Sequence, residues 1–196
     1  MKRSISFAIM LLVLGCGAAL ADTVSITSMG QYGSPWYGIY IGPYQLSVGG
    51  QQMGLLCISF DKELGTSWTA NVVDVTGDSS YTHIAYLVDL FGKTSDDKTR
   101  AEIQYAIWAL SPQNGPLGTT INWLTSHGAD AAFMAQVQYY AFTDNGTYSG
   151  SIIAYLAEPD NASQDFLRIG VPEPSSLLLL GTGLLAVGLA AFLRMK

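Results

Sequence analysis

The sequence predicts an α+β fold, in which a mainly antiparallel sheet carries a helical subregion. Short strand-like segments separated by glycines fill the first part of the chain's middle, and helical periodicity replaces them from residue 82 onward. Both ends of the chain are strongly apolar, with basic residues at their tips. The 196 residues therefore divide into a signal peptide (1–21), one globular domain (22–170) and a C-terminal hydrophobic helix (171–196).

The N-terminal segment has the three parts of a secretory signal peptide. Lys2 and Arg3 supply the positive charge, and residues 5–14 form an apolar run that is too short to span a membrane. Small residues then precede the bond between Ala21 and Asp22, where we expect signal cleavage.

Lipidation is an alternative use of this segment. Cys16 follows Val13-Leu14-Gly15, which loosely fits a lipidated cysteine. Leu14 suits that motif poorly, and the Ala-x-Ala sequence ending at Ala21 fits a signal peptidase better.

Strand-like alternation marks the first part of the globular domain. We expect strands at residues 23–27, 36–41, 44–48, 55–60 and 68–75, with two more at 152–156 and 165–169. Glycines separate the expected strands, and Gly49-Gly50 predicts a turn.

Helices are expected between these two groups of strands. Apolar residues at helical spacing predict a helix from residue 82 to a C-cap at Gly92. Asp96 and Asp97 then place negative charge at the start of a helix that continues through residues 100–110. Two further helices are expected at residues 120–126 and 129–142.

The charge balance and the motifs exclude several functions. Residues 22–172 carry five Lys and Arg against 14 Asp and Glu, a net charge of −9, so we expect no nucleic-acid partner. Neither a phosphate loop nor a dinucleotide fingerprint occurs, and we expect no cofactor. Cys57 with His83 and His127 is too sparse a set for a metal site, and no protease motif surrounds Cys57.

The C-terminal tail is an apolar run closed by basic residues. Residues 177–192 carry no charge, and a run of about 17 residues would extend about 26 Å, slightly less than the hydrocarbon core of a bilayer. Arg194 and Lys196 would stop transfer and keep the C-terminus in the cytoplasm.

Pro172-Glu173-Pro174, the hydrophobic run and the basic end resemble, in this order, the PEP-CTERM sorting signal. The resemblance implies an exosortase-type membrane protease as partner, cleavage near the triplet, and an intermediate tethered to the inner membrane. It also implies a final place on the cell surface or in the exopolysaccharide matrix of a Gram-negative bacterium. The alternative is a permanent tail anchor behind an incidental proline-rich linker.

Cys57 is the only cysteine that would remain after signal cleavage, which is unusual in an oxidising compartment. It lies in the apolar strand 55–60, and burial as an inert side chain is one interpretation. In the helix 100–110, periodicity places Gln104 on the margin of the buried face, one turn from Trp108.

Leu56-Cys57-Ile58 and Gln104-Tyr105-Ala106-Ile107-Trp108 resemble the two motifs of the thioester domains of bacterial surface adhesins, although Ile103 stands where that family usually has threonine. The resemblance implies an internal thioester between Cys57 and Gln104, shielded by Phe60, Tyr105 or Trp108, which captures an amine of a partner. The bond would form autocatalytically, so we expect adhesion rather than an enzyme with turnover.

Two rival functions stay open at this point. One is a non-covalent structural or glycan-binding matrix protein, with an aromatic face built from Trp36, Tyr37, Tyr40, Tyr44, Tyr139 and Tyr140. The other is a hydrolase of exopolysaccharide or protein, for which the sequence offers no candidate residues.

Overall fold

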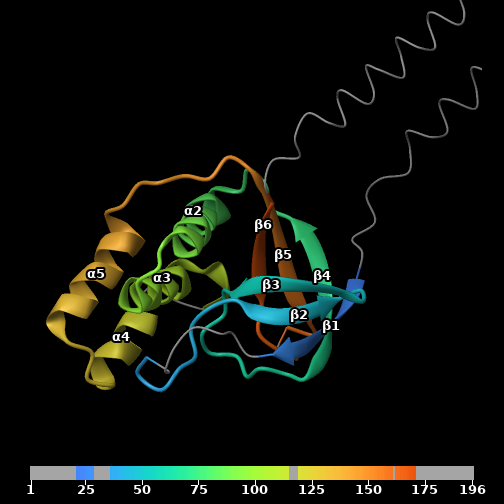
Figure 1. The fold of residues 1–196 in the computed structure, drawn as a ribbon, viewed down its shortest axis with the longest axis horizontal. Helices are drawn as coiled ribbons and strands as arrows, with labels where there is room; N and C mark the ends of the chain where they lie inside the picture. The colour runs from blue at the N-terminus through green and yellow to red at the C-terminus, as the bar shows by residue number, and fades with distance from the viewer. Residues whose placement is uncertain (1–20, 29–35, 115–118, 161, 171–196) are drawn as a thin grey trace, which may run out of the picture.

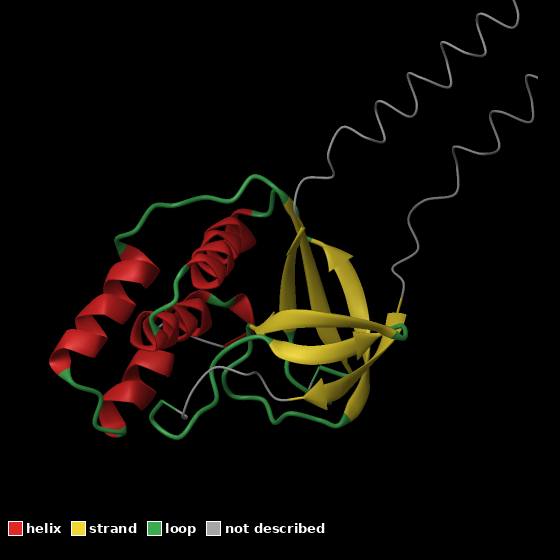
Figure 2. Ribbon diagram, in the orientation of Figure 1, coloured by secondary structure: helices red, strands yellow, loops and turns green. Residues whose placement is uncertain are grey.

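A computed structural model describes residues 21–28, 36–114, 119–160 and 162–170. In these residues six antiparallel strands close into a barrel, and four α-helices gather on one side of it (Figure 1). Figure 2 shows the two parts as separate groups of strands and helices that meet along one boundary. The predicted α+β class is therefore confirmed.

Most of the signal peptide and the whole C-terminal segment lie outside the described residues. The expectations for the hydrophobic helix, the Pro-Glu-Pro triplet, Arg194 and Lys196 fall there. Within the described ranges, no helix has the length and apolar character needed to cross a bilayer.

The barrel order is β1-β2-β3-β6-β5-β4, with antiparallel pairing at every step. The strands are β1 (Ala21–Ser28), β2 (Tyr44–Val48), β3 (Gln51–Cys57), β4 (Ser67–Asp74), β5 (Ser151–Glu158) and β6 (Phe166–Gly170). Strand β3 meets β6 at only two residue pairs, the second of which is Cys57 with Phe166. Cys57 therefore ends β3 at the point where β6 begins.

A tight hairpin joins β2 to β3. Gly49 and Gly50 both have positive φ angles, +54° and +84°, which a two-residue hairpin turn of this type requires and glycine accepts without strain. Pairing resumes at once, so β3 starts at Gln51, four residues before the predicted strand. A search for apolar residues misses this part of the strand, because the side chains of Gln51 and Gln52 are polar and exposed.

The strand predicted at residues 36–41 is wrong. Trp36 and Ile39 instead exchange two backbone hydrogen bonds across a turn at Tyr37 and Gly38. The aromatic rings here pack on the helices, since Trp36 stacks on Phe133 at 5.9 Å between ring centroids. The apolar residues at 36–41 are therefore explained by their contact with the helices and not by a position in the sheet.

The helices are α2 (Ser79–Lys93), α3 (Asp97–Leu110), α4 (Thr119–Ser126) and α5 (Ala131–Phe142). Asp96 caps α3 by accepting a hydrogen bond from the Thr99 amide at 2.7 Å, which confirms the acidic helix start. Gly92 is not a C-cap, because α2 continues to Lys93 and Thr94 occupies the cap position.

Helix α3 is the central helix of the helical part. All its residues from 101 to 109 are buried, because α2, α4, α5 and the end of β3 surround it. Gln104 is therefore fully buried, and its predicted place on the margin of the core is wrong. A helix with a single apolar stripe faces solvent on its other side, whereas this helix has no exposed side along these residues.

Candidate functional site

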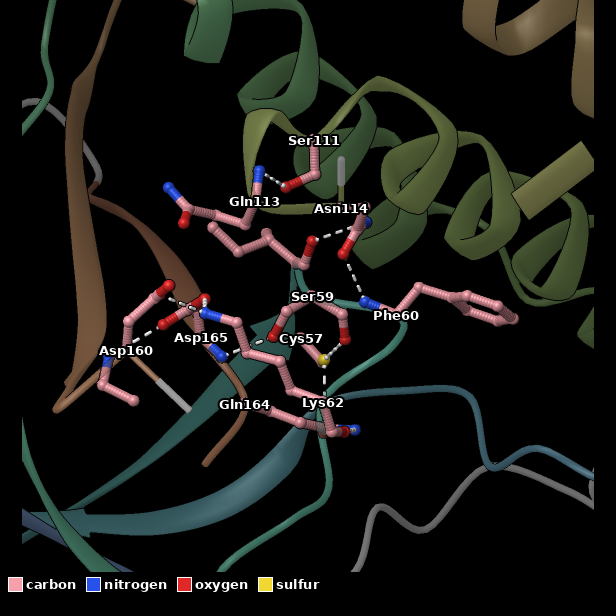
Figure 3. A network of polar contacts seen from close by, with 12 residues as sticks. Cys57, Ser59, Phe60, Lys62, Ser111, Gln113, Asn114, Asp160, Gln164 and Asp165 are labelled. Carbon is pink, nitrogen blue, oxygen red and sulfur yellow. Dashed lines mark hydrogen bonds and ion pairs between the residues drawn. The ribbon is translucent and has the colours of Figure 1, made fainter. Parts of the chain in front are cut away.

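The candidate site is built around Cys57, which is fully buried at the end of β3. Its thiol donates to the Ser59 carbonyl, with 3.0 Å between sulfur and oxygen, and to Oε1 of Gln164 at 3.2 Å. Figure 3 shows this sulfur among the loops that follow β3 and precede β6. The position is inside the domain, yet its neighbours are polar as well as apolar.

Helix α3 reaches the same residue through two side chains one turn apart. Gln104 donates its amide N–H to the Cys57 carbonyl oxygen at 2.9 Å, and Trp108 donates its indole N–H to that oxygen at 3.1 Å. The fold thus brings together Cys57 and Gln104, which are 47 positions apart in the chain. The spacing of four residues lets both donors point at one carbonyl.

The other end of the Gln104 amide is unusual. Its carbonyl oxygen, Oε1, is buried and has no hydrogen-bond partner among the described residues. An unsatisfied buried acceptor costs about 1–3 kcal/mol, so native structures contain few of them. Such a group calls for an explanation.

An aromatic cluster lies next to this pair. The rings of Tyr105 and Trp108 are 5.1 Å apart between centroids, Phe60 lies 5.2 Å from Trp108 and 6.3 Å from Tyr105, and Trp123 lies 5.1 Å from Phe60. Tyr105 and Trp108 are buried, and Phe60 is half-buried. The three residues expected to shield a thioester therefore form one cluster, in which Trp108 touches Cys57 through its hydrogen bond.

Burial controls the acidity of the thiol. The loss of solvation raises the pKa of Cys57 to about 12, since a thiolate is poorly stabilised in the interior. The buried thiol is therefore protonated at neutral pH. Burial likewise raises the pKa of Tyr105, whose hydroxyl donates to the Trp36 carbonyl at 2.9 Å.

Asn114 joins the chain after Cys57 to the end of α3. Its side-chain amide donates to the carbonyls of Ile58 and Trp108, at 3.1 Å and 2.6 Å, and its oxygen accepts from the Phe60 amide. This side chain fixes the segment next to Cys57 relative to the helix that carries Gln104. No sequence pattern predicted this role of Asn114, whose only signal is its place in a segment rich in proline and glycine.

A second polar group anchors Gln164 and Ser59 (Figure 3). Buried Asp165 forms an ion pair with Lys62 at 2.6 Å and donates its backbone N–H to Ser59 Oγ at 2.6 Å. Gln164 donates to the Lys62 carbonyl at 3.0 Å, which leaves its Oε1 directed at the Cys57 sulfur. These contacts join residues about 100 positions apart, and no local pattern in the sequence signals them.

The structure places the other candidate residues away from Cys57. The ring nitrogens of His83 contact the carbonyls of Gly146 and Tyr140, and the ring of His127 stacks on Trp123. Among the described residues no three His, Cys, Asp or Glu side chains gather as metal ligands would.

The six aromatic residues considered for a glycan face do not share one environment. Tyr44 is buried against Phe166, whereas Tyr40 and Tyr139 are exposed. Trp36 and Tyr37 contact Phe133.

The expected signal-cleavage bond lies at the start of β1. Ala21 pairs with Asn71 and Asp22 pairs with Ala70 of β4. The first residue of the expected mature chain is therefore already part of the barrel.

Comparison with known proteins gives two findings. The structure is similar to the N-terminal thioester domain of the fibronectin-binding protein SfbI from Streptococcus pyogenes, over 77% of this chain and 94% of that domain, with 12% identity and a TM-score of 0.43. A likeness at that level carries no argument about chemistry. No curated protein matches the chain.

The second finding concerns the C-terminal end. Residues 170–195 match the family described as the PEP-CTERM protein-sorting motif, as the sequence predicted. The motif implies export, processing by an exosortase at the membrane, and delivery to the surface. The chain therefore carries a PEP-CTERM sorting motif at residues 170–195.

Proposed function

We propose that this protein is an exported adhesion protein that forms an internal thioester between Cys57 and Gln104 and attaches covalently to amines on partner molecules. The observation that carries the proposal is the buried Gln104 amide, which is bound to the Cys57 carbonyl at 2.9 Å while its own oxygen has no partner among the described residues. The two residues joined by this hydrogen bond carry the thiol and the carboxamide that a thioester requires.

The proposed reaction needs no co-reactant. The Cys57 sulfur attacks the side-chain carbonyl carbon of Gln104, the bond from sulfur to carbon forms, and the bond from carbon to nitrogen breaks. The thiol proton leaves with the nitrogen as ammonia. The fold contributes proximity, which replaces a large part of the barrier of a reaction between separate molecules. A thioester carbonyl is a weaker acceptor than an amide, so the reaction also relieves the unsatisfied Gln104 oxygen.

An amine from a partner would then attack the same carbonyl carbon and return the sulfur to Cys57 as a thiol. The product is an amide bond between Gln104 and the partner. A lysine of a surface protein or an amine-bearing exopolysaccharide supplies such a group, and the sorting motif would deliver the domain to a place where both occur. We propose the biofilm matrix of a Gram-negative bacterium as that place.

Intact mass spectrometry of the purified full chain tests the proposal. We expect a mass lower by one ammonia than the mass of the sequence, and addition of methylamine should replace this species with one heavier by one methylamine. Cys57→Ala and Gln104→Ala should each show neither change. The full unmodified mass in folded protein would contradict the proposal and leave a non-covalent surface protein with a packed cysteine.

Gln164 supplies the matched control, because its side-chain amide contacts the Cys57 sulfur, whereas the amide of Gln104 contacts the Cys57 carbonyl oxygen. Gln164→Ala should still lose one ammonia if Gln104 is the reacting amide. Loss of ammonia that persists in Gln104→Ala and disappears in Gln164→Ala would move the bond to Gln164. Release of sugars or peptides from a polymer would support the hydrolase instead.

A further inference from the structure

The Cys57 carbonyl oxygen accepts two hydrogen bonds from one helix, and the proposed reaction affects them differently. Gln104 donates through the nitrogen that leaves as ammonia, whereas Trp108 donates through an indole nitrogen that takes no part in the chemistry. Both distances, 2.9 Å and 3.1 Å, are those of ordinary hydrogen bonds.

The two states of the protein can be compared donor by donor. Before the reaction, while Gln104 is still an amide, the Cys57 carbonyl has both donors. The loss of either donor then leaves the carbonyl with one hydrogen bond. In the thioester state the Gln104 nitrogen is gone, and among the described residues only Trp108 donates to this oxygen. Cys57 is fully buried, so water does not replace a missing donor there without a change of structure.

We propose that Trp108 is a positioning residue whose indole N–H stabilises the thioester state by satisfying the Cys57 carbonyl once ammonia has left. This inference rests on the proposed Cys57–Gln104 thioester and adds to the shielding role of the Trp108 ring. The indole keeps β3 attached to α3 at the reacting residue in both states. Its hydrogen bond becomes indispensable only after the reaction.

Trp108→Phe keeps an aromatic ring at this position and removes the N–H. The probe is ammonium, because free ammonia reverses the reaction and restores the Gln104 amide. In the full chain, the fraction of molecules lacking one ammonia is measured by intact mass over a series of ammonium concentrations, approached from both directions. We expect the ammonium concentration at which half of the molecules lack ammonia to be about 5- to 150-fold lower for Trp108→Phe than for the wild type, the ratio that one unsatisfied buried carbonyl produces.

Trp123→Phe is the matched control. Trp123 belongs to the same aromatic cluster and stacks on Tyr105, but it is not a donor to the Cys57 carbonyl. Its substitution should leave the midpoint within a factor of about two of the wild type, as expected for a site away from the reaction. Hydrolysis converts Gln104 to a glutamate of different mass and is counted separately, so weaker shielding is not mistaken for a shifted midpoint.

Each result has one meaning. Equal midpoints in the wild type and Trp108→Phe would overturn the positioning role while leaving the thioester intact, and so would equal shifts in both tryptophan variants. If Trp108→Phe is poorly folded, its thermal stability in the Cys57→Ala background measures the loss of folding stability that does not depend on the reaction. A wild type that never loses ammonia would instead contradict the proposed function itself.

Discussion

The chemistry of Cys57 is set by the same burial that would protect a thioester from water. A thiol with a pKa of about 12 is ionised in about one molecule in 100,000 at pH 7, so the reactive thiolate is scarce. Apolar surroundings therefore slow both the formation of the bond and its hydrolysis. We therefore expect the proposed bond, once formed, to persist until an amine reaches it.

Alkylation of Cys57 tests the raised pKa. In Gln104→Ala, where the proposed thioester cannot form, we expect iodoacetamide at pH 7 to modify the folded protein at least about 1,000-fold more slowly than the unfolded protein, because the thiolate fraction falls by that factor between a pKa of 9.0 and one of about 12. The rate should rise tenfold per pH unit up to pH 11. Equal rates in folded and unfolded protein would show an exposed, ordinary thiol.

The ion pair between Lys62 and Asp165 gives a second prediction at the residue scale. Asp165→Asn should lower the free energy of unfolding by about 3 kcal/mol, since it removes one charge of a buried pair whose carboxylate also accepts a hydrogen bond from the Ala157 amide. Urea unfolding measures this loss. Asp160→Asn is the control, because Asp160 contacts the same Lys62 amine but its side chain is 90% exposed. A loss in Asp160→Asn as large as in Asp165→Asn would contradict the distinction between buried and exposed partners.

Helix α3 is the element that carries the site, and its start depends on Asp96. Hydrogen bonds from the side chain and backbone of Thr99 hold the pKa of the Asp96 carboxyl below its ordinary value of 3.8. A group with a lowered folded pKa contributes stability above its unfolded pKa, and that contribution is lost as the pH falls through the folded value. The cap is therefore at full strength at neutral pH and weakens below about pH 4.

Thermal unfolding of Asp96→Ala checks this element. At pH 7 the variant should unfold at a lower temperature than the wild type, and the gap should narrow as the pH is reduced from 4 to 2. Asp97→Ala is the control, because Asp97 pairs with Arg100 on the helix surface and is not the cap. A gap that does not change with pH would show that the Asp96 carboxylate does not act as a charged cap.

For the whole molecule, the short distance in sequence between the last strand of the barrel and the sorting motif determines what processing would leave. Strand β6 ends at Gly170, which accepts a hydrogen bond from the Tyr148 hydroxyl at 2.6 Å, and Pro172 of the sorting motif follows after a single residue. An exosortase acting at the triplet would therefore cut directly beside the folded barrel. The processed domain would keep almost no linker.

Processing of the tail is testable in the host bacterium. We expect the protein recovered from the cell surface to begin at Asp22 and to lack residues 177–196, as shown by intact mass and terminal sequencing. Replacing Pro172, Glu173 and Pro174 together by alanine should leave the tail in place and the protein in the membrane fraction. A surface form that retains residues 177–196 would contradict cleavage by an exosortase.

Local patterns in the sequence determined the parts whose causes are local. The C-terminal sorting motif, the helix start at Asp96 and the turn at Gly49-Gly50 each depend on neighbouring residues. The signal peptide at residues 1–21 stays a prediction. The pair of Cys57 and Gln104 was also identified from two short motifs. Periodicity failed at residues 36–41 and at Gln104, because there the burial comes from neighbouring elements on several sides.

Tertiary structure alone decided how the site is assembled. Closure of the barrel brings β6 beside β3, and this places Gln164 and Asp165 next to Cys57 across more than 100 positions of chain. Packing of α3 against the end of β3 sets two donors on one carbonyl and leaves the Gln104 oxygen buried without a partner among the described residues. Contacts between segments distant in sequence follow from the closed topology of the barrel, whereas local patterns specify only the individual strands and helices from which it is built.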